Sequence, residues 1–324
     1  MALPSIANDL AHFERQFAAQ LDDREQAVRF LLQYLSGQHA GRLRPKVLLL
    51  TAGMQGKIGP ESHRMALVVE LLHLASLIHD DVVDNAVERR NQLTVNAVWD
   101  NKIAVLLGDY LLSKALDLIR ESDLPGVLEQ VSATVRQLTV GEISQLSQYN
   151  NLDLSEPEYL HIVSLKTASL IETAFRLGAI SAGADAEQAE AYGRFGQRFG
   201  CFFQLKDDLK DYAATSDGKG IYNDMREGDI TLPVIYAMRR LCLAERAVFR
   251  QQYLHVGKCE ADLAGLAGTV RQCGALEQAC VQLRNMEEEL LHDVAAFPVS
   301  PYRDDLAQLV LETGNIDFLQ LQLR

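Results

Sequence analysis

Apolar residues recur every three or four positions along most of the chain, and this spacing predicts α-helices. Alternation of apolar and polar residues over the length of a strand is hard to find. Several segments are apolar on more than one face, so some of the predicted helices must be central in the fold. The segments with helical spacing are 64–84, 103–119, 128–146, 159–182, 186–212, 232–241, 261–291 and 305–311.

Residues that interrupt helices separate these segments. They cluster at 56–60, 123–126, 150–157, 183 and 215–220. Ser155 is expected to cap the helix that follows it, with Pro157 in the first turn and Glu158 at the capping-box position. No linker rich in proline, glycine or serine divides the chain. We therefore expect residues 1–324 to form a single all-α domain of long helices and short loops.

The composition narrows the classes of binding partner. The 324 residues include 44 Asp plus Glu against 31 Lys plus Arg, which gives a formal net charge of −13. Nucleic acids and anionic membranes require a basic face, so neither is an expected partner. The longest apolar stretch, 65–78, contains Glu70 and His73 and is too short and too polar to span a bilayer.

The cysteines and the N-terminus favour a cytoplasmic location. The five cysteines are odd in number and form no CxxC pair, which is typical of a reducing compartment rather than of a disulfide framework or a zinc site. The first 17 residues lack the basic region and apolar core of a signal peptide.

Two clusters of aspartates end apolar helical segments. They are Asp80, Asp81 and Asp84 in the first cluster, and Asp207, Asp208 and Asp211 in the second. Asp80 and Asp84 share a helical face, where like charges repel and where the helix dipole disfavours acids. A bound cation would compensate for this repulsion. Carboxylate oxygens with room for water are typical of Mg²⁺, which also binds substrate phosphates.

Arginines suited to phosphate groups flank the first cluster in the sequence. Arg89 and Arg90 follow it closely, and Arg42 and Arg44 precede Pro45. A guanidinium group matches the geometry of phosphate oxygens. Metal ions and arginines around a polyanion are the general arrangement for diphosphate chemistry.

The order and spacing of these motifs resemble the trans-isoprenyl diphosphate synthases, that is, the polyprenyl synthetase family. The resemblance extends over roughly residues 42–239. Its motifs are GRLRP (41–45), ELLHLASLIHDDVVD (70–84), ERRNQLTVN (88–96), LLGDYLL (106–112), GEISQL (141–146), LKTASL (165–170), FGCFFQLKDDLKDY (199–212) and GKGIYNDMREGDITLP (218–233). The resemblance implies an isoprenoid-synthase helical bundle around a deep central cavity, usually as a homodimer.

The resemblance also implies the reaction. Isopentenyl diphosphate would condense with an allylic diphosphate of the geranyl or farnesyl type, and diphosphate would be released. Mg²⁺ would be the metal, as three ions with substrate bound, with Mn²⁺ as the alternative. The implied metal ligands are Asp80, Asp84, Asp207 and Asp211, with Asp208 in support, and Asp81 is a further catalytic candidate.

The remaining roles implied by the resemblance concern the substrates. Arg89 and Lys219 would bind the allylic diphosphate, and Arg44, His73 and Arg90 the diphosphate of isopentenyl diphosphate. Lys166, Thr167 and Gln204 would surround the reacting carbons, and Phe203 would be a further substrate contact. Thr167 and Gln204 would offer their dipoles to the carbocation, and an apolar cavity would keep water away from it.

Small residues before the first cluster predict a long product. In the family, the residues four and five positions before the first aspartate decide whether the growing chain is blocked, and here they are Ser76 and Ala75. Leu72 and Val69 lie one and two turns further up, at about 5.4 Å per turn. We therefore expect a long tunnel and an octaprenyl-like product.

Two departures from the family pattern leave alternatives open. The family usually carries lysine where this chain has Gly41 and Asp229, and each lost cation removes charge-assisted bonds worth about 1.5–3 kcal/mol. Arg42 is the candidate replacement for the first lysine. The chain is then either a synthase with reduced substrate affinity or a weakly active paralogue that serves as a subunit or regulator of another synthase.

A class I terpene cyclase is a third alternative, since it shares the first motif. It would need a second motif of the NDxxSxxxE type. Met-Arg-Glu follows Asn223 and Asp224 and does not fit that motif.

Overall fold

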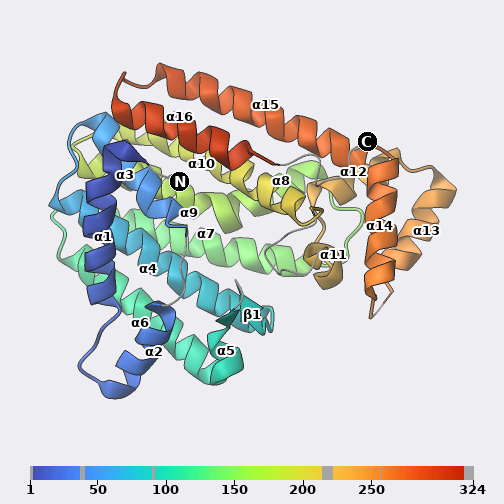
Figure 1. The fold of residues 1–324 in the computed structure, drawn as a ribbon, viewed down its shortest axis with the longest axis horizontal. Helices are drawn as coiled ribbons and strands as arrows, with labels where there is room; N and C mark the ends of the chain where they lie inside the picture. Colours follow the sequence, from blue (N-terminus) through green and yellow to red (C-terminus); the bar gives the residue numbers. More distant parts are fainter. Residues whose placement is uncertain (1–2, 37–40, 90–91, 214–221, 256, 317–324) are drawn as a thin grey trace. The chain divides into compact units, whose positions relative to one another are not determined.

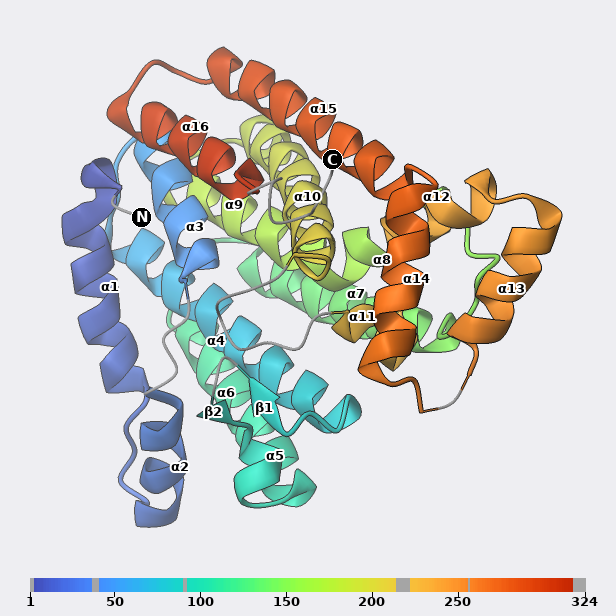
Figure 2. The ribbon, with the colours of Figure 1, turned by 45° about the vertical axis from the view of Figure 1, so that its right-hand side comes forward.

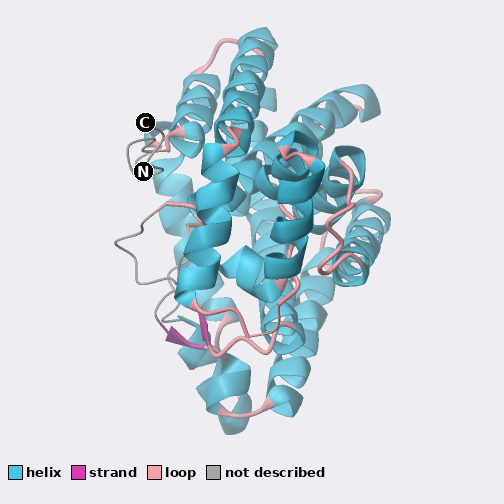
Figure 3. Ribbon diagram, turned by 90° about the vertical axis from the view of Figure 1, so that its right-hand side faces the viewer, coloured by secondary structure: helices cyan, strands magenta, loops and turns pink. Residues whose placement is uncertain are grey.

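The computed structural model describes residues 3–36, 41–89, 92–213, 222–255 and 257–316 (Figure 1). These residues are almost entirely helical (Figure 3). The sheet found among them is an antiparallel pair of two-residue strands, β1 (Glu88–Arg89) and β2 (Gln92–Leu93). The predicted all-α class is confirmed.

The chain divides into two compact units, each assembled from separate stretches. The first unit comprises Met1–Thr134, Leu170–Gly196 and Ala295–Leu306, and the second comprises Val135–Ser169, Gln197–Val294 and Ala307–Arg324. The single domain expected for 1–324 stays a prediction.

The first unit holds the N-terminal helices. They are a 3₁₀ turn (Pro4–Ile6), α1 (Ala7–Gln20), α2 (Gln26–Ser36), α3 (Leu43–Gln55), α4 (Pro60–Val83), α5 (Val95–Val98) and α6 (Asn101–Arg120). The helices that supply residues to both units are α7 (Val127–Ser147), α9 (Ser169–Ser181), α10 (Ala186–Lys210), α15 (Ala275–Ala296) and α16 (Pro301–Gly314).

The second unit holds the remaining elements. They are α8 (Glu156–Val163), a π-helical turn (Ser164–Ala168), α11 (Asn223–Glu227), α12 (Leu232–Arg240), α13 (Leu243–Tyr253) and α14 (Glu260–Gln272). The expected cap of α8 is confirmed, because Ser155 and Glu158 form a capping box. The side chain of Ser155 accepts from the Glu158 amide, and that of Glu158 accepts from the Ser155 amide.

Helix α4 is the central helix of the first unit, as its apolar faces predict. All eight residues from Met65 to Leu72 are buried, so no face of this segment is left to solvent. Helices α4 and α6 lie side by side in two views (Figures 1 and 2). Burial of this segment on every side fixes the course of the helix that carries the first aspartate cluster.

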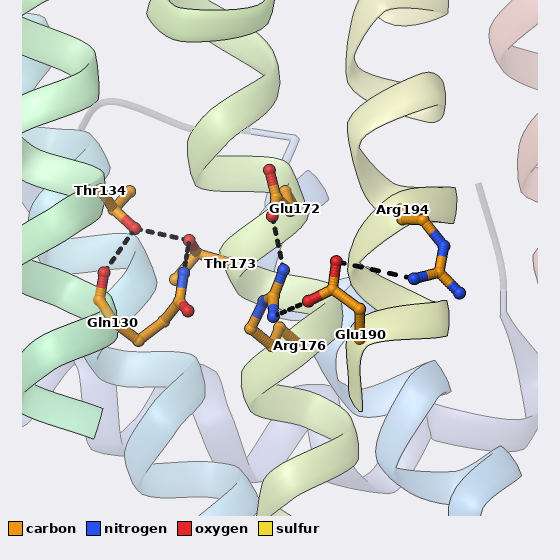
Figure 4. A network of polar contacts seen from close by, with 7 residues as sticks. All are labelled: Gln130, Thr134, Glu172, Thr173, Arg176, Glu190 and Arg194. Atoms are coloured by element: carbon orange, nitrogen blue, oxygen red, sulfur yellow. Dashed lines mark hydrogen bonds and ion pairs between the residues drawn. The ribbon is translucent and has the colours of Figure 1, made fainter. Parts of the chain in front are cut away.

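A polar network joins α7, α9 and α10 within the first unit (Figure 4). The buried hydroxyl of Thr173 accepts from Gln130 at 3.1 Å and lies 2.6 Å from the Thr134 hydroxyl. Arg176 binds both Glu172 and Glu190. The hydrogen bonds of this network satisfy the buried hydroxyls of Thr134 and Thr173, which would otherwise be costly to bury.

Two helix boundaries differ from those that the sequence pattern predicts. The segment 261–291 is two helices, because Gly274 adopts a left-handed φ of 75° and ends the continuous pattern between α14 and α15. The segment 159–182 contains the π-helical turn between α8 and α9. Among the described residues, no helix combines the length and apolar character needed to cross a membrane.

Candidate active site

The first aspartate cluster lies at the C-terminal end of α4. The helix ends at Val83, and Asn85 follows with a left-handed φ of 51°. The amide of Asp84 donates to the carbonyl of Asp80 at 2.8 Å, so these two residues are one helical turn apart, as predicted. Asp80 is half-buried and Asp84 is exposed, so both reach solvent.

Asp81 lies on the buried side of the same turn and binds Arg89. Nε of Arg89 donates to Oδ1 of Asp81 at 2.6 Å. Burial raises the pKa of Asp81, and the Arg89 guanidinium acts in the opposite direction. Asp81 therefore holds the arginine that, by the family resemblance, is expected to bind the allylic diphosphate.

The segment that leads from α4 into β1, the strand with Arg89, is held by two side chains that the sequence did not point to. The Thr94 hydroxyl donates to the Ala86 carbonyl at 2.6 Å, and the Asn96 amide donates to the same carbonyl at 3.0 Å. Both residues belong to the motif ERRNQLTVN, so their motif was recognised although their role was not. Arg90 lies outside the described residues.

Arg42 is engaged by two carboxylates. It precedes α3 with a φ of 52°, and its guanidinium binds Glu70 at 2.7 Å and Glu14 at 3.0 Å. Glu70 is only 2% exposed. The guanidinium carbon also lies 4.4 Å from the centre of the Phe17 ring. For Arg42 to replace a substrate-binding lysine, it would have to exchange these contacts for the diphosphate.

The other residues assigned near isopentenyl diphosphate lie on α3 and α4. Arg44 is in the first turn of α3, and His73 is half-buried on α4. Gly41 is exposed, and a Cβ added to it would meet nothing within 4 Å.

The four residues predicted to set chain length follow α4 toward its N-terminus. Val69, Leu72 and Ala75 are buried. Ser76 is half-buried, and its hydroxyl donates to the His73 carbonyl at 2.9 Å. The hydroxyl is therefore satisfied within its own helix.

The second aspartate cluster ends α10, and its three members have different surroundings. Asp207 is exposed, with the Lys206 ammonium 3.5 Å away. Asp211 accepts from the backbone amides of Asn223 and Asp224, at 2.9 and 3.1 Å, at the start of α11.

Asp208, the third member, is 4% exposed. Its two carboxylate oxygens accept from Tyr159 at 2.6 Å and from Gln204 at 2.8 Å. Burial raises the pKa of Asp208 to about 7, although these two hydrogen bonds lower it.

The π-helical turn presents Lys166 and Thr167. Thr167 donates to the side-chain oxygen of Gln204 at 2.7 Å, and the Lys166 ammonium binds Glu142 at 2.8 Å. Phe203 is half-buried, with the Lys206 ammonium 5.5 Å from its ring centre. The structure thus brings Thr167 and Gln204 together, as the resemblance implies.

The second unit contains a cavity of about 190 Å³. Its walls include Tyr159, Lys166, Thr167, Gln204, Asp208, Asp224, Asp229 and the apolar side chains of Ile162, Val163 and Ile230. One carboxylate oxygen of Asp229 accepts from Gln145 at 2.6 Å. Burial raises the pKa of Asp224, and the neighbouring Asp211 raises it further.

The residues in or beside this cavity that the sequence did not point to include Glu142, Gln145, Tyr159 and Asp224. Glu142 and Gln145 stand in the motif GEISQL, which was the available signal. Lys219 lies outside the described residues. Among the residues that are described, no three metal-ligating side chains form a preformed metal site.

Comparison with known families identifies the class of protein. A model of the family described as Polyprenyl synthetase matches residues 25–269. The chain therefore belongs to the polyprenyl synthetase family, as the motifs predict.

Curated relatives at about 30% identity span nearly the whole chain. An all-trans-nonaprenyl-diphosphate synthase (geranyl-diphosphate specific) from Rhodobacter capsulatus is 33% identical, over 95% of this chain and 94% of the relative. The octaprenyl diphosphate synthase of Escherichia coli is 31% identical, over 94% of each chain. Component 2 of the heptaprenyl diphosphate synthase of Bacillus subtilis is 30% identical, over 98% of this chain and 91% of the relative.

A solved structure agrees in fold. The polyprenyl synthase from Caulobacter crescentus, complexed with calcium and isoprenyl diphosphate, superposes with a TM-score of 0.90 at 30% identity. The match covers 97% of this chain and 96% of the other. The isoprenoid-synthase fold implied by the motifs is thereby confirmed.

Proposed function

We propose that the chain is a Mg²⁺-dependent prenyltransferase of the cytoplasm that extends an allylic diphosphate of the geranyl or farnesyl type with isopentenyl diphosphate. The product would be a long-chain all-trans polyprenyl diphosphate, and diphosphate would be released. The observation that carries the proposal is the cavity that holds Lys166, Thr167 and Gln204, in a chain whose relatives are named for long-chain products.

The carboxylates of the two aspartate clusters are suitable ligands for a hard divalent cation. Asp80, Asp84 and Asp207 offer carboxylates that reach solvent, and we propose Asp211 as a further ligand. Mg²⁺ commonly keeps several waters and completes its shell with substrate phosphates, so a preformed all-protein cage is not required. When bound, the metal supplies positive charge that stabilises the departing diphosphate.

The chain's own residues would handle the organic part of the substrates. Thr167 and Gln204 present oxygen dipoles to a carbocation, and Lys166, held by Glu142, adds a cation near the diphosphate. Ile162, Val163 and Ile230 give the cavity apolar walls that exclude water, which would otherwise quench the cation. Arg44, His73, Arg89, Arg90 and Lys219 are the proposed diphosphate contacts.

We further propose that Gly41 and Asp229 weaken substrate binding. Gly41 supplies no cation where the family usually has one. Asp229 lines the cavity, so its carboxylate lies where an anionic substrate is expected. Like charges in a partly buried site raise the free energy of binding an anion.

We also propose that the chain forms a homodimer through α6. Val105, Leu106 and Leu116 of this helix are exposed, and Leu106 is 63% exposed. Exposed apolar side chains that gather on one element mark interaction surfaces. Light scattering of the purified protein would test this, and a monomer at working concentrations would contradict it.

The second candidate function is a subunit of another synthase. The missing lysines favour this function, as does the relative named as component 2 of a heptaprenyl diphosphate synthase. Incubating the purified chain with Mg²⁺, isopentenyl diphosphate and farnesyl diphosphate separates the two candidates. A series of elongated products supports the synthase, whereas no product at any substrate concentration supports the subunit.

A further inference from the structure

Hydrogen bonds donated by Thr167, Gln204 and Tyr159 form a chain that links the Thr167 hydroxyl to the Asp208 carboxylate. Tyr159 donates to one oxygen of Asp208 at 2.6 Å, and Gln204 donates to the other at 2.8 Å. The Thr167 hydroxyl then donates to the side-chain oxygen of Gln204 at 2.7 Å. All four residues line the cavity of the second unit.

The acceptor at one end sets the direction of the whole chain. Both oxygens of Asp208 accept hydrogen bonds, one from Tyr159 and the other from Gln204, so Gln204 turns its NH₂ group toward Asp208. The side-chain oxygen of Gln204 must then face Thr167. Thr167 gives its single hydroxyl proton to that oxygen, and the free lone pair of the hydroxyl is left for the cavity.

The backbone that carries Thr167 is held on two sides by glycines. A Cβ on Gly141 of α7 would lie 2.5 Å from the amide nitrogen of Lys166, and a Cβ on Gly200 of α10 would lie 2.5 Å from Cα of Ala168. Both contacts are with the π-helical turn. Only glycine permits such close approach of two backbones, so the position of the hydroxyl is fixed as well as its direction.

We infer that Asp208 and Tyr159 are positioning residues: acting through Gln204, they keep the hydroxyl proton of Thr167 turned away from the reacting carbons and its lone pair turned toward them. The inference rests on the proposed function. An oriented lone pair stabilises a developing allylic cation, whereas an O–H proton at the same place would repel it. Asp208 would therefore act through hydrogen bonds rather than as a metal ligand.

Asp208→Asn tests the direction of the chain with little change in shape. Tyr159 still needs an acceptor, so the new amide turns its oxygen to Tyr159 and its NH₂ to Gln204. Gln204 must then rotate and donate to Thr167, whose proton turns into the cavity. We expect kcat to fall by about tenfold or more, with KM for both substrates close to that of the wild type.

A second substitution makes the test specific. Tyr159→Phe in the Asp208→Asn background frees the amide to turn its oxygen back to Gln204, so most of the lost rate should return. Tyr236→Phe in the same background is the matched control. Tyr236 is buried and donates to a carboxylate, that of Glu156, at 2.9 Å, but it does not line the cavity.

Three results would overturn the inference. One is that Asp208→Asn keeps the wild-type rate. Another is that Tyr159→Phe restores nothing, or no more than Tyr236→Phe does, which would point to direct metal binding by Asp208. The third is that the wild-type protein makes no product. This result would reject the proposed function and, with it, the positioning role. The first two results leave the proposed function standing, so the two failures are distinguishable.

Discussion

Gly41 and Asp229 both stand where the family usually has lysine, yet their surroundings differ. Space is open around Gly41, since a Cβ there meets nothing within 4 Å. Asp229 is part of a packed cavity wall and accepts a hydrogen bond from Gln145. Lysine can therefore replace Gly41 without strain. Lysine at Asp229, by contrast, would remove the acceptor of the hydrogen bond from Gln145.

Restoring the two lysines should strengthen substrate binding. Gly41→Lys with Asp229→Lys should lower KM for isopentenyl diphosphate by about tenfold or more, because each charge-assisted bond is worth about 1.5–3 kcal/mol. Steady-state kinetics measure this change. Asp229→Asn is the matched control, since it removes the charge but keeps an acceptor for Gln145. An unchanged KM in the double variant would reject the proposed role of these positions.

Ser76 is the residue at which product length is expected to be most sensitive. Ser76→Phe should shorten the product, because an aromatic ring would occupy space beside the buried residues Leu72 and Ala75. Chromatography of the products checks the prediction. Ser76→Ala is the control, since it removes the hydroxyl without adding volume. If the phenylalanine variant keeps the wild-type chain length, these residues do not bound a tunnel.

At the scale of single elements, the π-helical turn depends on a close contact with α7. Gly141→Ala should destabilise the protein by about 1–3 kcal/mol, because the new methyl group would meet the backbone of the turn at Cα of Lys166, 2.8 Å away. The rate of product formation should fall as well, because a displaced π-helical turn also displaces the Thr167 hydroxyl. Thermal unfolding and kinetics measure the two effects.

Gly265 of α14 provides the matched control for this element. A Cβ at Gly265 meets nothing within 4 Å, so Gly265→Ala should stabilise the helix by roughly 0.5–1 kcal/mol. If alanine destabilises the protein at Gly141 and stabilises it at Gly265, then tertiary contact, and not helix propensity, decides the change in stability at Gly141. A change in stability in the same direction at both positions would contradict the proposed contact.

Helical periodicity predicted most elements but not their interruptions. The breakers at 56–60, 123–126, 150–157 and 183 fall around the observed helix ends, whereas 215–220 lies outside the described residues. The π-helical turn was missed because its residues keep an apolar pattern close to that of an α-helix. The break at Gly274 was missed because a single glycine in a helical pattern is usually tolerated.

At the scale of the whole molecule, the net charge of −13 has to be reconciled with an anionic substrate. We expect inorganic diphosphate to bind with Mg²⁺ present and not after the metal is chelated, because uncompensated carboxylates repel it. Calorimetric titration measures this. Asp80→Asn with Asp84→Asn should weaken the Mg²⁺-dependent binding, whereas equal affinity with and without Mg²⁺ would contradict the proposed metal role.

The sequence by itself determined the helical class, the family, and the two aspartate clusters at helix ends. The helical class and the clusters follow from periodicity and spacing, which are local properties of the chain, and the family follows from the resemblance of its motifs. Only the tertiary structure decided what each charged group contacts. It paired Arg42 with Glu70 and Glu14, Arg89 with Asp81, and Asp208 with Tyr159 and Gln204. Such pairings depend on burial and on contacts between residues distant in sequence, so residues of one motif acquired different environments.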